Sequence, residues 1–273
     1  MDADELLERY ANGQRDFRGV DLHWATLSGT DLSGINLEGA QLHGACLSTE
    51  HRRTYFIGAN FSQADLSEAH LSKANLSQAN LTHANLCQAD LSRVVLSGAN
   101  LCRADLSETI LIRAVLRHAD LSETDLSRSI LTHVDLENAH LSHTNLSKAD
   151  LSRTDLRGVP LGKATLSGIN LSKTDMTGLD LSRKLLTGAN LNGADLRNAD
   201  LRNAYLIRVD LVDANLAGAD LSGIKLMDSS LKGANLNQAK LAKADLRGTN
   251  LTKTQLRHAY LKGAIMPDGS VYD

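Results

Sequence analysis

Large apolar residues recur at every fifth position along nearly the whole chain. From Phe56 to Met266 the spacing holds without exception, and the 43 positions carry 39 Leu, two Phe and two Met. An earlier block with the same spacing runs from Phe17 to Leu47. The pattern predicts one repeating architecture from residue 17 to residue 266, interrupted once between the two blocks.

The positions beside each apolar centre are restricted as well. Between Phe61 and Met266, the residue two before the centre is Ala in 25 of 42 units and Ser or Thr in nine. The residue one before the centre is Asp or Asn in 26 of the 42, and Ser often follows the centre, as in Ala64-Asp65-Leu66-Ser67-Glu68. We therefore expect the leucine and the small residue to face inward and the other three residues to face outward.

A period of five fits neither a helix nor a flat strand. Five residues of an α-helix leave successive leucines about 140° apart, and an odd spacing in a strand puts them on opposite faces. Each unit must therefore contain a bend, which suits Asp and Asn because their side chains bond to nearby backbone groups. A chain that bends the same way in every unit winds into stacked coils, which predicts a solenoid.

Units such as Ala74-Asn75-Leu76-Ser77-Gln78 resemble those of the pentapeptide-repeat family, and the resemblance covers nearly the whole chain. It implies an all-β solenoid, a right-handed quadrilateral β-helix with four units in each coil and about twelve coils in this chain. The spacing alone leaves the number of sides open. The opening segment, residues 2–17, and the ending, residues 264–270, resemble cyanobacterial members of the family, including regulators of heterocyst differentiation.

We expect a single repeat domain over residues 1–273. Leu6, Leu7 and Tyr10 have helical spacing, so residues 2–12 should form an N-terminal helical cap. The expected segments after it are a first repeat block at 17–47, a loop insertion at 48–55, a continuous block at 56–266 and a C-terminal tail at 267–273. The tail should end the repeat because Pro267 cannot donate to a backbone ladder.

Two positions break the pattern. Leu47 and Phe56 are nine residues apart, and an unbroken register would point Arg52 inward at a high cost in free energy. We expect a four-residue insertion that loops out, with Phe56 and Phe61 filling the space where the coil restarts. Lys184 occupies a slot for small inward residues, so either the backbone bulges there or the amine snorkels out, and we favour the bulge.

Composition narrows the function. The net charge is −3, there are only three Cys, and no apolar run is long enough to span a membrane. His140 and His143 are the closest histidine pair, but no set of Cys or carboxylates with ligand spacing accompanies them. We expect a cytoplasmic monomer that is not an enzyme, with no cofactor, no metal, no nucleic acid and no membrane among its partners.

One outward column could form a binding face if the coil has twenty residues. It carries Lys73, Arg93, Arg113, His133, Arg153 and Lys173, and outward apolar residues lie on the same face or at the adjoining corner: Val95, Ile110, Ile112, Val115 and Ile130. An apolar patch with arginines at its rim is typical of an interaction site. In the alternative interpretation the β-branched residues only strengthen stacked strands, while the arginines are solvated and pair with Asp90, Asp135 and Asp155.

A second candidate surface contains the single tryptophan, Trp24, together with Arg52, Arg53 and Tyr55 near the interruption. The alternative is that Trp24 packs against the N-terminal helix or the inserted loop.

The sequence favours a protein–protein interaction scaffold, with a possible regulatory setting in a cyanobacterium. The alternative is DNA mimicry that protects a type II topoisomerase, which another branch of the family performs. Such mimics resemble strongly acidic rods that dimerise through C-terminal elements, whereas this chain is nearly neutral and carries a basic column.

Overall fold

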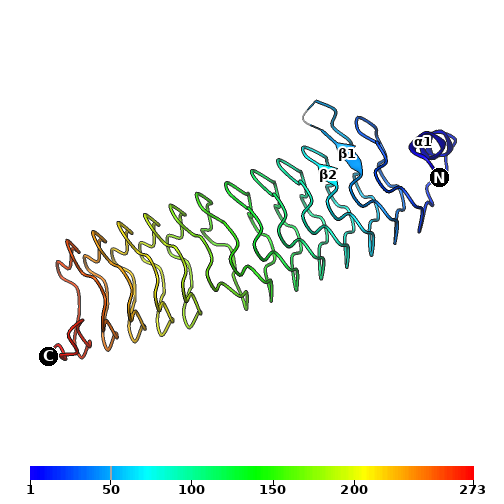
Figure 1. Cartoon of the computed structure of the whole chain (residues 1–273). Helices are drawn as coiled ribbons and strands as arrows, with labels where there is room; N and C mark the ends of the chain where they lie inside the picture. Colours follow the sequence, from blue (N-terminus) through cyan, green and yellow to red (C-terminus); the bar gives the residue numbers. More distant parts are fainter. Residues whose placement is uncertain (50) are drawn as a thin grey trace. The chain divides into compact units, whose positions relative to one another are not determined.

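The chain winds into coils that are joined by parallel backbone bridges between residues twenty apart. The computed structural model describes residues 1–49 and 51–273, and Figure 1 shows successive coils stacked on one another within residues 51–145. Asp65 is bridged to Asn85, Asn85 to Asp105 and Asp105 to Asp125. Since twenty residues hold four five-residue units, each coil is a four-sided turn of a β-helix.

Outside the interruption at Leu47, a tight turn follows the apolar centres and bends the chain at each corner. In the unit around Leu66, the Ala69 N–H donates to the Leu66 carbonyl at 3.1 Å, and Glu68 between them has a φ of 58°. An Asp65 carboxylate oxygen accepts the Ser67 N–H at 3.0 Å. The preference for Asp or Asn one residue before the centre thus has a physical cause, because that side chain closes the turn.

Leucine and alanine side chains fill the interior, as the repeat predicts. The centres from Leu66 to Leu246 are buried, and so are most of the residues two positions before them. Where Thr or Ser occupies this inner slot, its hydroxyl donates to a backbone carbonyl, either three residues earlier or in the preceding coil. Thr144 bonds the Leu121 carbonyl at 2.8 Å and Ser229 bonds the Leu206 carbonyl at 2.6 Å.

The chain divides into two compact units, where the sequence leads us to expect one domain. The first comprises Met1–Asn145 with Gly162–Ala164, and the second comprises Leu146–Leu161 with Thr165–Asp273. Both contain the same four-sided coils, with Asp65↔Asn85 in the first and Asp195↔Asn215 in the second as examples of their bridges.

A nine-residue helix, α1 (Ala3–Ala11), opens the first unit. The Asp2 side chain accepts the Glu5 N–H at 2.8 Å at the start of the helix. Leu6 is fully buried, and the Tyr10 hydroxyl donates to the Ser33 carbonyl at 2.7 Å, which ties the helix to a coil. Across the described part of the chain, no helix combines the length and the apolar character that crossing a bilayer requires.

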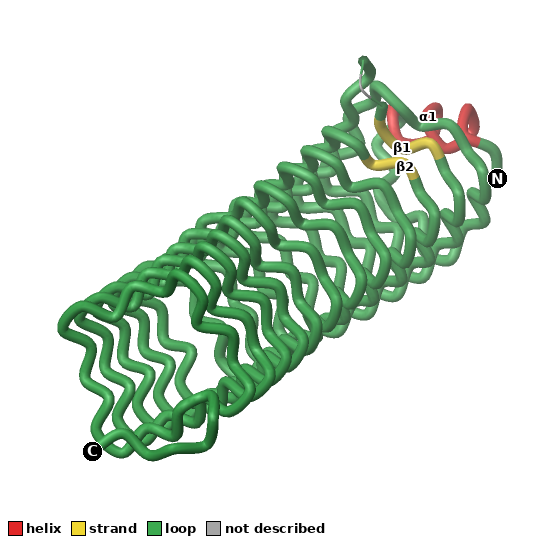
Figure 2. The backbone as a smooth tube through the Cα atoms, turned by 60° about the vertical axis from the view of Figure 1, so that its left-hand side comes forward, coloured by secondary structure: helices red, strands yellow, loops and turns green. Residues whose placement is uncertain are grey.

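The coil at the interruption is four residues longer than the others. Asp31 is bridged to Tyr55 and Asn36 to Asn60, in both cases 24 residues apart. Two short strands, β1 (Cys46–Ser48) and β2 (His70–Leu71), pair in parallel here with a register shift, and Figure 2 shows them side by side. The Arg52 side chain is exposed; Glu50, within the predicted loop at 48–55, lies outside the described residues.

The coil does not bulge at Lys184, so the bulge that we favoured from the sequence is wrong. The Lys184 N–H donates to Leu181 O at 3.2 Å, its carbonyl accepts the Tyr205 N–H, and Leu186 remains buried. The Lys184 amine donates to the Leu161 carbonyl at 3.3 Å, which is the bond to the preceding coil that Thr and Ser make from the same slot. A lysine therefore fits in this slot because its amine donates the same hydrogen bond to the preceding coil as a Thr or Ser hydroxyl does.

The segment after the last repeat folds back on it. Val271 pairs with Ile265 in an antiparallel bridge, and the Tyr272 carbonyl accepts the Gly263 N–H at 2.7 Å. The regular parallel ladder of the second unit is thus replaced by an antiparallel return at residues 267–273.

Candidate functional site

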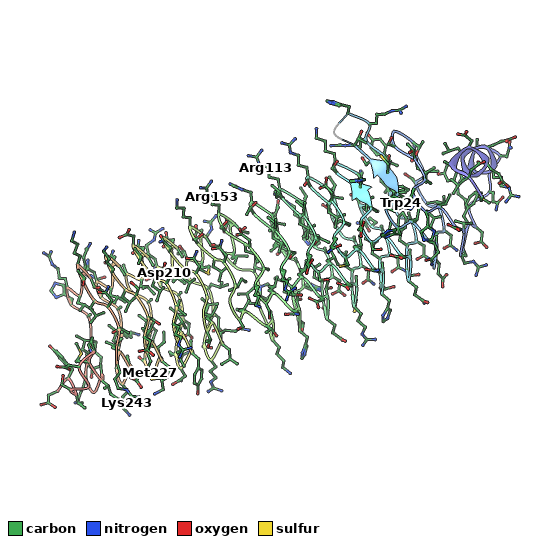
Figure 3. The ribbon with its side chains drawn as sticks, in the orientation of Figure 1. Trp24, Arg113, Arg153, Asp210, Met227 and Lys243 are labelled. Atoms are coloured by element: carbon green, nitrogen blue, oxygen red, sulfur yellow. The ribbon has the colours of Figure 1, made fainter. Side chains whose placement is uncertain are left out.

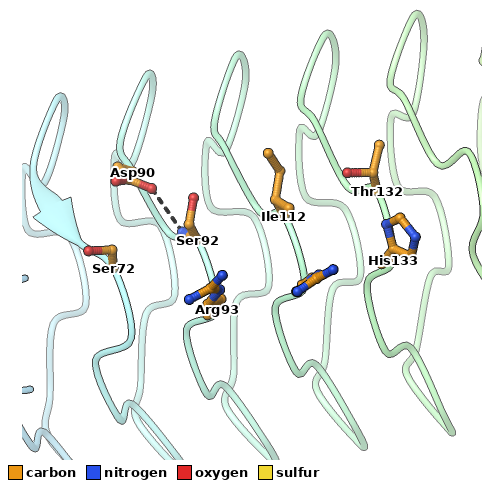
Figure 4. Close-up of a pocket in the computed structure, with 8 residues that line it drawn as sticks. Ser72, Asp90, Ser92, Arg93, Ile112, Thr132 and His133 are labelled. Atoms are coloured by element: carbon orange, nitrogen blue, oxygen red, sulfur yellow. Dashed lines mark hydrogen bonds between the residues drawn. The ribbon is translucent and has the colours of Figure 1, made fainter. Parts of the chain in front are cut away.

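An open groove of about 670 Å³ lies on one side of the first unit. We call it the basic groove, and Figure 4 shows its lining residues: Ser72, Asp90, Ser92, Arg93, Ile112, Arg113, Thr132 and His133. Four of the predicted binding-face residues are among them, namely Arg93, Ile112, Arg113 and His133. The groove crosses consecutive coils, so residues twenty apart in the sequence line it side by side.

Two positions of the five-residue unit build this groove. Ile112 comes one residue after its centre, Leu111, and points outward because the centre points inward. Arg93, Arg113 and His133 come two residues after their centres, with φ values of 57°, 57° and 58°. The Arg93 N–H donates to the Ile112 carbonyl at 2.8 Å and the Arg113 N–H donates to the Thr132 carbonyl at 3.0 Å. Backbone bonds between coils therefore hold these three side chains in one row.

Two carboxylates near the row have other partners as well. Asp135 forms an ion pair with Arg117 at 2.5 Å, and Asp90 accepts the Ser92 N–H at 2.9 Å. Among the described residues, the Arg113 guanidinium forms no ion pair. Arg113 is exposed, which agrees with the solvated arginines of the alternative interpretation and also leaves its guanidinium accessible to an incoming anion.

The other apolar candidates lie beside the groove and do not line it. Ile110 is bridged to Ile130, and Val95 is bridged to Val115 on the adjoining face. Ile130 is 39% exposed, whereas Val95, Ile110 and Val115 are half-buried. Their direct pairing in bridges agrees with a stabilising role for β-branched residues, and Ile130 also extends the apolar surface next to Ile112.

Arg153 belongs to the second unit, whereas the other candidates of this face belong to the first. It is exposed, has a φ of 61° and donates its N–H to the Ser172 carbonyl at 3.0 Å. Figure 3 labels its side chain together with those of Arg113 and Trp24. Arg153 thus has the same local backbone geometry in the second unit as Arg113 has in the first.

The residues of the second candidate surface occupy separate positions. The Trp24 ring, 65% exposed, lies over Gly44 and meets the His43 ring edge-on at 5.0 Å between centroids. Arg52 lies against Gly29, Arg53 is exposed, and Tyr55 belongs to the bridged column of Asp31 and Asn75. The predicted packing of Trp24 against the helix or the loop is replaced by packing on the next coil.

Sequence reasoning missed four residues of the basic groove: Ser72, Asp90, Ser92 and Thr132. Each lies one residue before or after an apolar centre of the same column, so a known coil length would have found them. Their hydroxyl and carboxylate groups make the floor of the groove polar around Ile112. No three His, Cys, Asp or Glu side chains among the described residues are grouped so that they could hold a metal ion.

The comparisons with known proteins agree with this geometry. A family model for pentapeptide repeats matches eight copies over residues 16–49, 54–93, 89–128, 119–158, 155–193, 185–223 and 229–266. These repeats form a right-handed quadrilateral β-helix. Among curated proteins, no match is found.

Three solved structures illustrate the range of similar chains. HetL from the cyanobacterium Nostoc, a pentapeptide-repeat protein involved in heterocyst differentiation regulation, is 34% identical over 100% of both chains, with a TM-score of 0.41. Rfr23 from the cyanobacterium Cyanothece is 29% identical over 47% of this chain and 88% of its own, with a TM-score of 0.26. The fluoroquinolone resistance protein QnrB1 is 17% identical over 70% and 90%, with a TM-score of 0.33.

Proposed function

Because the chain belongs to the pentapeptide-repeat family, whose members are structural and interaction proteins, we propose that it binds a protein partner through the basic groove. The observation that carries the proposal is the row of Arg93, Arg113 and His133 beside Ile112 in one open groove. Arginine and large apolar side chains are the residue types that contribute most to binding at protein interfaces.

The chemistry of the groove indicates what kind of partner segment fits. A large apolar side chain can cover Ile112, while carboxylates beside it can accept from Arg113 and Arg93 in two-pronged hydrogen bonds. The arginines lie one coil apart, about 4.8 Å, so an acidic segment that runs across the coils meets more than one cation. We infer a partner with a surface that combines acidic and apolar residues.

The proposed role is binding without catalysis. A catalytic hydroxyl needs a base that takes its proton. No hydroxyl of Ser72, Ser92 or Thr132 bonds to His133 among the described residues, and the ladder holds each side chain in its own column. The cations of the groove also count against DNA mimicry, because a mimic must present negative charge.

A comparative pull-down tests this function. The bait proteins are the wild type, the groove variant Ile112→Glu/Arg113→Glu and the control variant Ile57→Glu/Lys243→Glu. The control makes the same charge change at equivalent slots, since Ile57 follows its centre by one residue and is 43% exposed, and Lys243 follows its centre by two with a φ of 57°. A cyanobacterial lysate is the source, because both ends of the chain resemble cyanobacterial members of the family.

We expect at least one protein to be recovered with the wild type and with the control variant and to be lost with the groove variant. Equal recovery of every protein by all three baits would remove the groove from the proposal. Thermal unfolding of each bait, followed by circular dichroism, verifies that the variants are folded.

A further inference from the structure

A second apolar surface lies on the second unit, where two outward columns run side by side. One column holds Leu185, Tyr205, Lys225 and Asp245, each bridged to the next in parallel. The other holds Thr187, Ile207, Met227 and Arg247, each one residue after its buried centre. Backbone bonds such as Arg208 N–H to Met227 O, at 3.1 Å, keep these residues in register.

Four large apolar side chains come together in these columns, and we call them the Leu185–Met227 patch: Leu185, Tyr205, Ile207 and Met227. Leu185 is 63% exposed and Tyr205 is 45% exposed, while Ile207 and Met227 are half-buried. The stick view in Figure 3 labels Met227. The residue before a centre is usually Asp or Asn, whose side chain closes the turn. Leu185 and Tyr205 occupy this position with apolar side chains that face solvent.

Cations surround the patch. Lys225 and Arg247 both approach Asp245, at 3.9 and 2.8 Å, and this carboxylate is almost fully buried beneath them. Arg183 and Arg208 are exposed and form no ion pair within the described residues. Within these two columns and the corner positions that border them, the other acid among the described residues is Asp228, which follows the centre Leu226 by two residues. The rim therefore has more positive than negative charge.

We propose that the Leu185–Met227 patch is a docking site for an acidic amphipathic helix of a partner protein. The backbone N–H and carbonyl groups under the patch bond to adjacent coils, as in Tyr205 N–H to Lys184 O at 2.8 Å, so a partner is recognised through side chains and adds no strand. Outward residues in these columns lie about 5 to 7 Å apart, which matches the spacing of apolar residues on one helix face.

The charge of the rim selects the occupant. A second copy of this chain would bring Arg183, Arg208, Lys225 and Arg247 against the same cations, because a two-fold interface places the same surface on both sides. An acidic helix instead supplies carboxylates to Arg183 and Arg208 while its apolar face covers Leu185 and Tyr205. This site is independent of the basic groove, which lies in the first unit.

Labelled synthetic peptides and fluorescence anisotropy test the proposal on the full chain. The probe is an amphipathic helical peptide with leucines on one face and glutamates on the other. Its two comparison peptides have lysine in place of glutamate and a scrambled order of the same residues. The patch variant is Leu185→Ser/Tyr205→Ser, and its control is Ile57→Ser/Tyr260→Ser, which removes two apolar residues of similar exposure, 43% and 54%, from other faces.

We expect the acidic peptide to bind the wild type and the control at least about tenfold more tightly than either comparison peptide. The patch variant should bind it about tenfold more weakly than the wild type, a loss that deletion of two partly exposed apolar contacts can supply. Arg208→Glu should weaken binding of the acidic peptide and strengthen binding of the lysine peptide, whereas Lys253→Glu, at an equivalent slot of another corner with a φ of 60°, should change neither.

Three results would overturn the proposal. The first is that the acidic peptide binds no better than the others. The second is that binding is lost in Ile112→Glu/Arg113→Glu but kept in the patch variant, which would assign the peptide to the basic groove. The third is that light scattering finds a wild-type dimer that the patch variant converts to a monomer, which would make the patch a self-association surface.

Discussion

The second residue after most apolar centres adopts a left-handed backbone conformation, whatever its side chain; Lys163 and Asp268 do not. Among the described residues, thirty other than glycine do so, with φ between 55° and 62°. This conformation costs an L-residue about 1–2 kcal/mol, and glycine avoids the cost. The turn requires this conformation. Arginine in place of glycine at Arg93 and Arg113 therefore lowers the free energy of unfolding, but it places a charged side chain at the corner.

Replacing Arg113 by glycine should separate stability from binding. The relief of left-handed strain, about 1–2 kcal/mol, equals or exceeds the extra entropy of glycine in the unfolded chain, about 0.4–1 kcal/mol, so Arg113→Gly should leave the free energy of unfolding unchanged or raise it by up to about 1.6 kcal/mol. The same variant should weaken the partner recovered through the groove. Urea unfolding and a binding titration measure the two effects, and a loss of stability with intact binding would contradict the prediction.

Burial lowers the pKa of the Lys184 ammonium, because its half-buried slot removes water from the charged form. Below this lowered pKa the folded and unfolded chains both hold the proton. Between it and the unfolded value of 10.5, the unfolded chain holds more protons, so the free energy of unfolding rises with pH across this window.

Lys184→Met should remove this contribution. Urea unfolding of both proteins from pH 8 to about pH 10.5 gives the difference between their stabilities, and the wild type should gain on the variant as pH rises. A difference that stays constant with pH would show that the amine titrates alike in the folded and unfolded chains.

At the scale of the five-residue unit, most of the structure follows from the sequence. The leucine ladder and the turn closed by Asp65 follow from residue types that repeat at fixed positions. The number of units in each coil does not follow from the sequence, because the five-residue spacing stays the same for any number of units per coil. The parallel bridges at twenty residues supply that number.

The candidate site could be predicted only in part, because the sequence alone leaves the number of residues per coil open. Ile112 stands out as an exception to the repeat, and Arg93, Arg113 and His133 stand out as a column of basic residues, whereas Ser92 and Thr132 are ordinary repeat residues whose place in the groove depends on the neighbouring coils. Trp24 could not be placed from the sequence, because its position depends on the space that Gly44, twenty residues later, leaves open. At Lys184 the repeat predicts the correct slot, but the expected bulge is wrong because the amine bonds to the preceding coil instead.

The element that restarts the coil depends on a pair of aromatic rings. Phe56 and Phe61 are fully buried and meet edge-to-face, with 5.1 Å between their centroids. Phe56→Leu should lower the free energy of unfolding by about 1–3 kcal/mol, through lost volume and the lost ring contact. Phe17→Leu is the control, because the Phe17 ring meets no other aromatic ring among the described residues; equal losses in both variants would argue against the ring contact.

At the scale of the whole molecule, the net charge does not reveal the local excess of cations at the two proposed surfaces. The chain carries 29 Lys and Arg against 32 Asp and Glu, yet the basic groove and the Leu185–Met227 patch are each rich in cations. Cationic rims disfavour self-pairing of either surface.

We therefore expect a monomer in solution. Size-exclusion chromatography with light scattering should give a mass near 29.4 kDa that does not change with protein concentration. A mass near twice this value would mean that a surface other than the two proposed ones joins two copies, or that the charge argument is wrong.

The central claim is that the basic groove binds a protein partner through Ile112 and its row of cations. The most direct measurement is a calorimetric titration of the partner recovered by the pull-down, at two salt concentrations, with the wild type, Ile112→Glu/Arg113→Glu and Ile57→Glu/Lys243→Glu. The account predicts that the wild type and the control bind alike and weaken together as salt rises, and that the groove variant binds at least about tenfold more weakly. Equal affinity of all three proteins would contradict it.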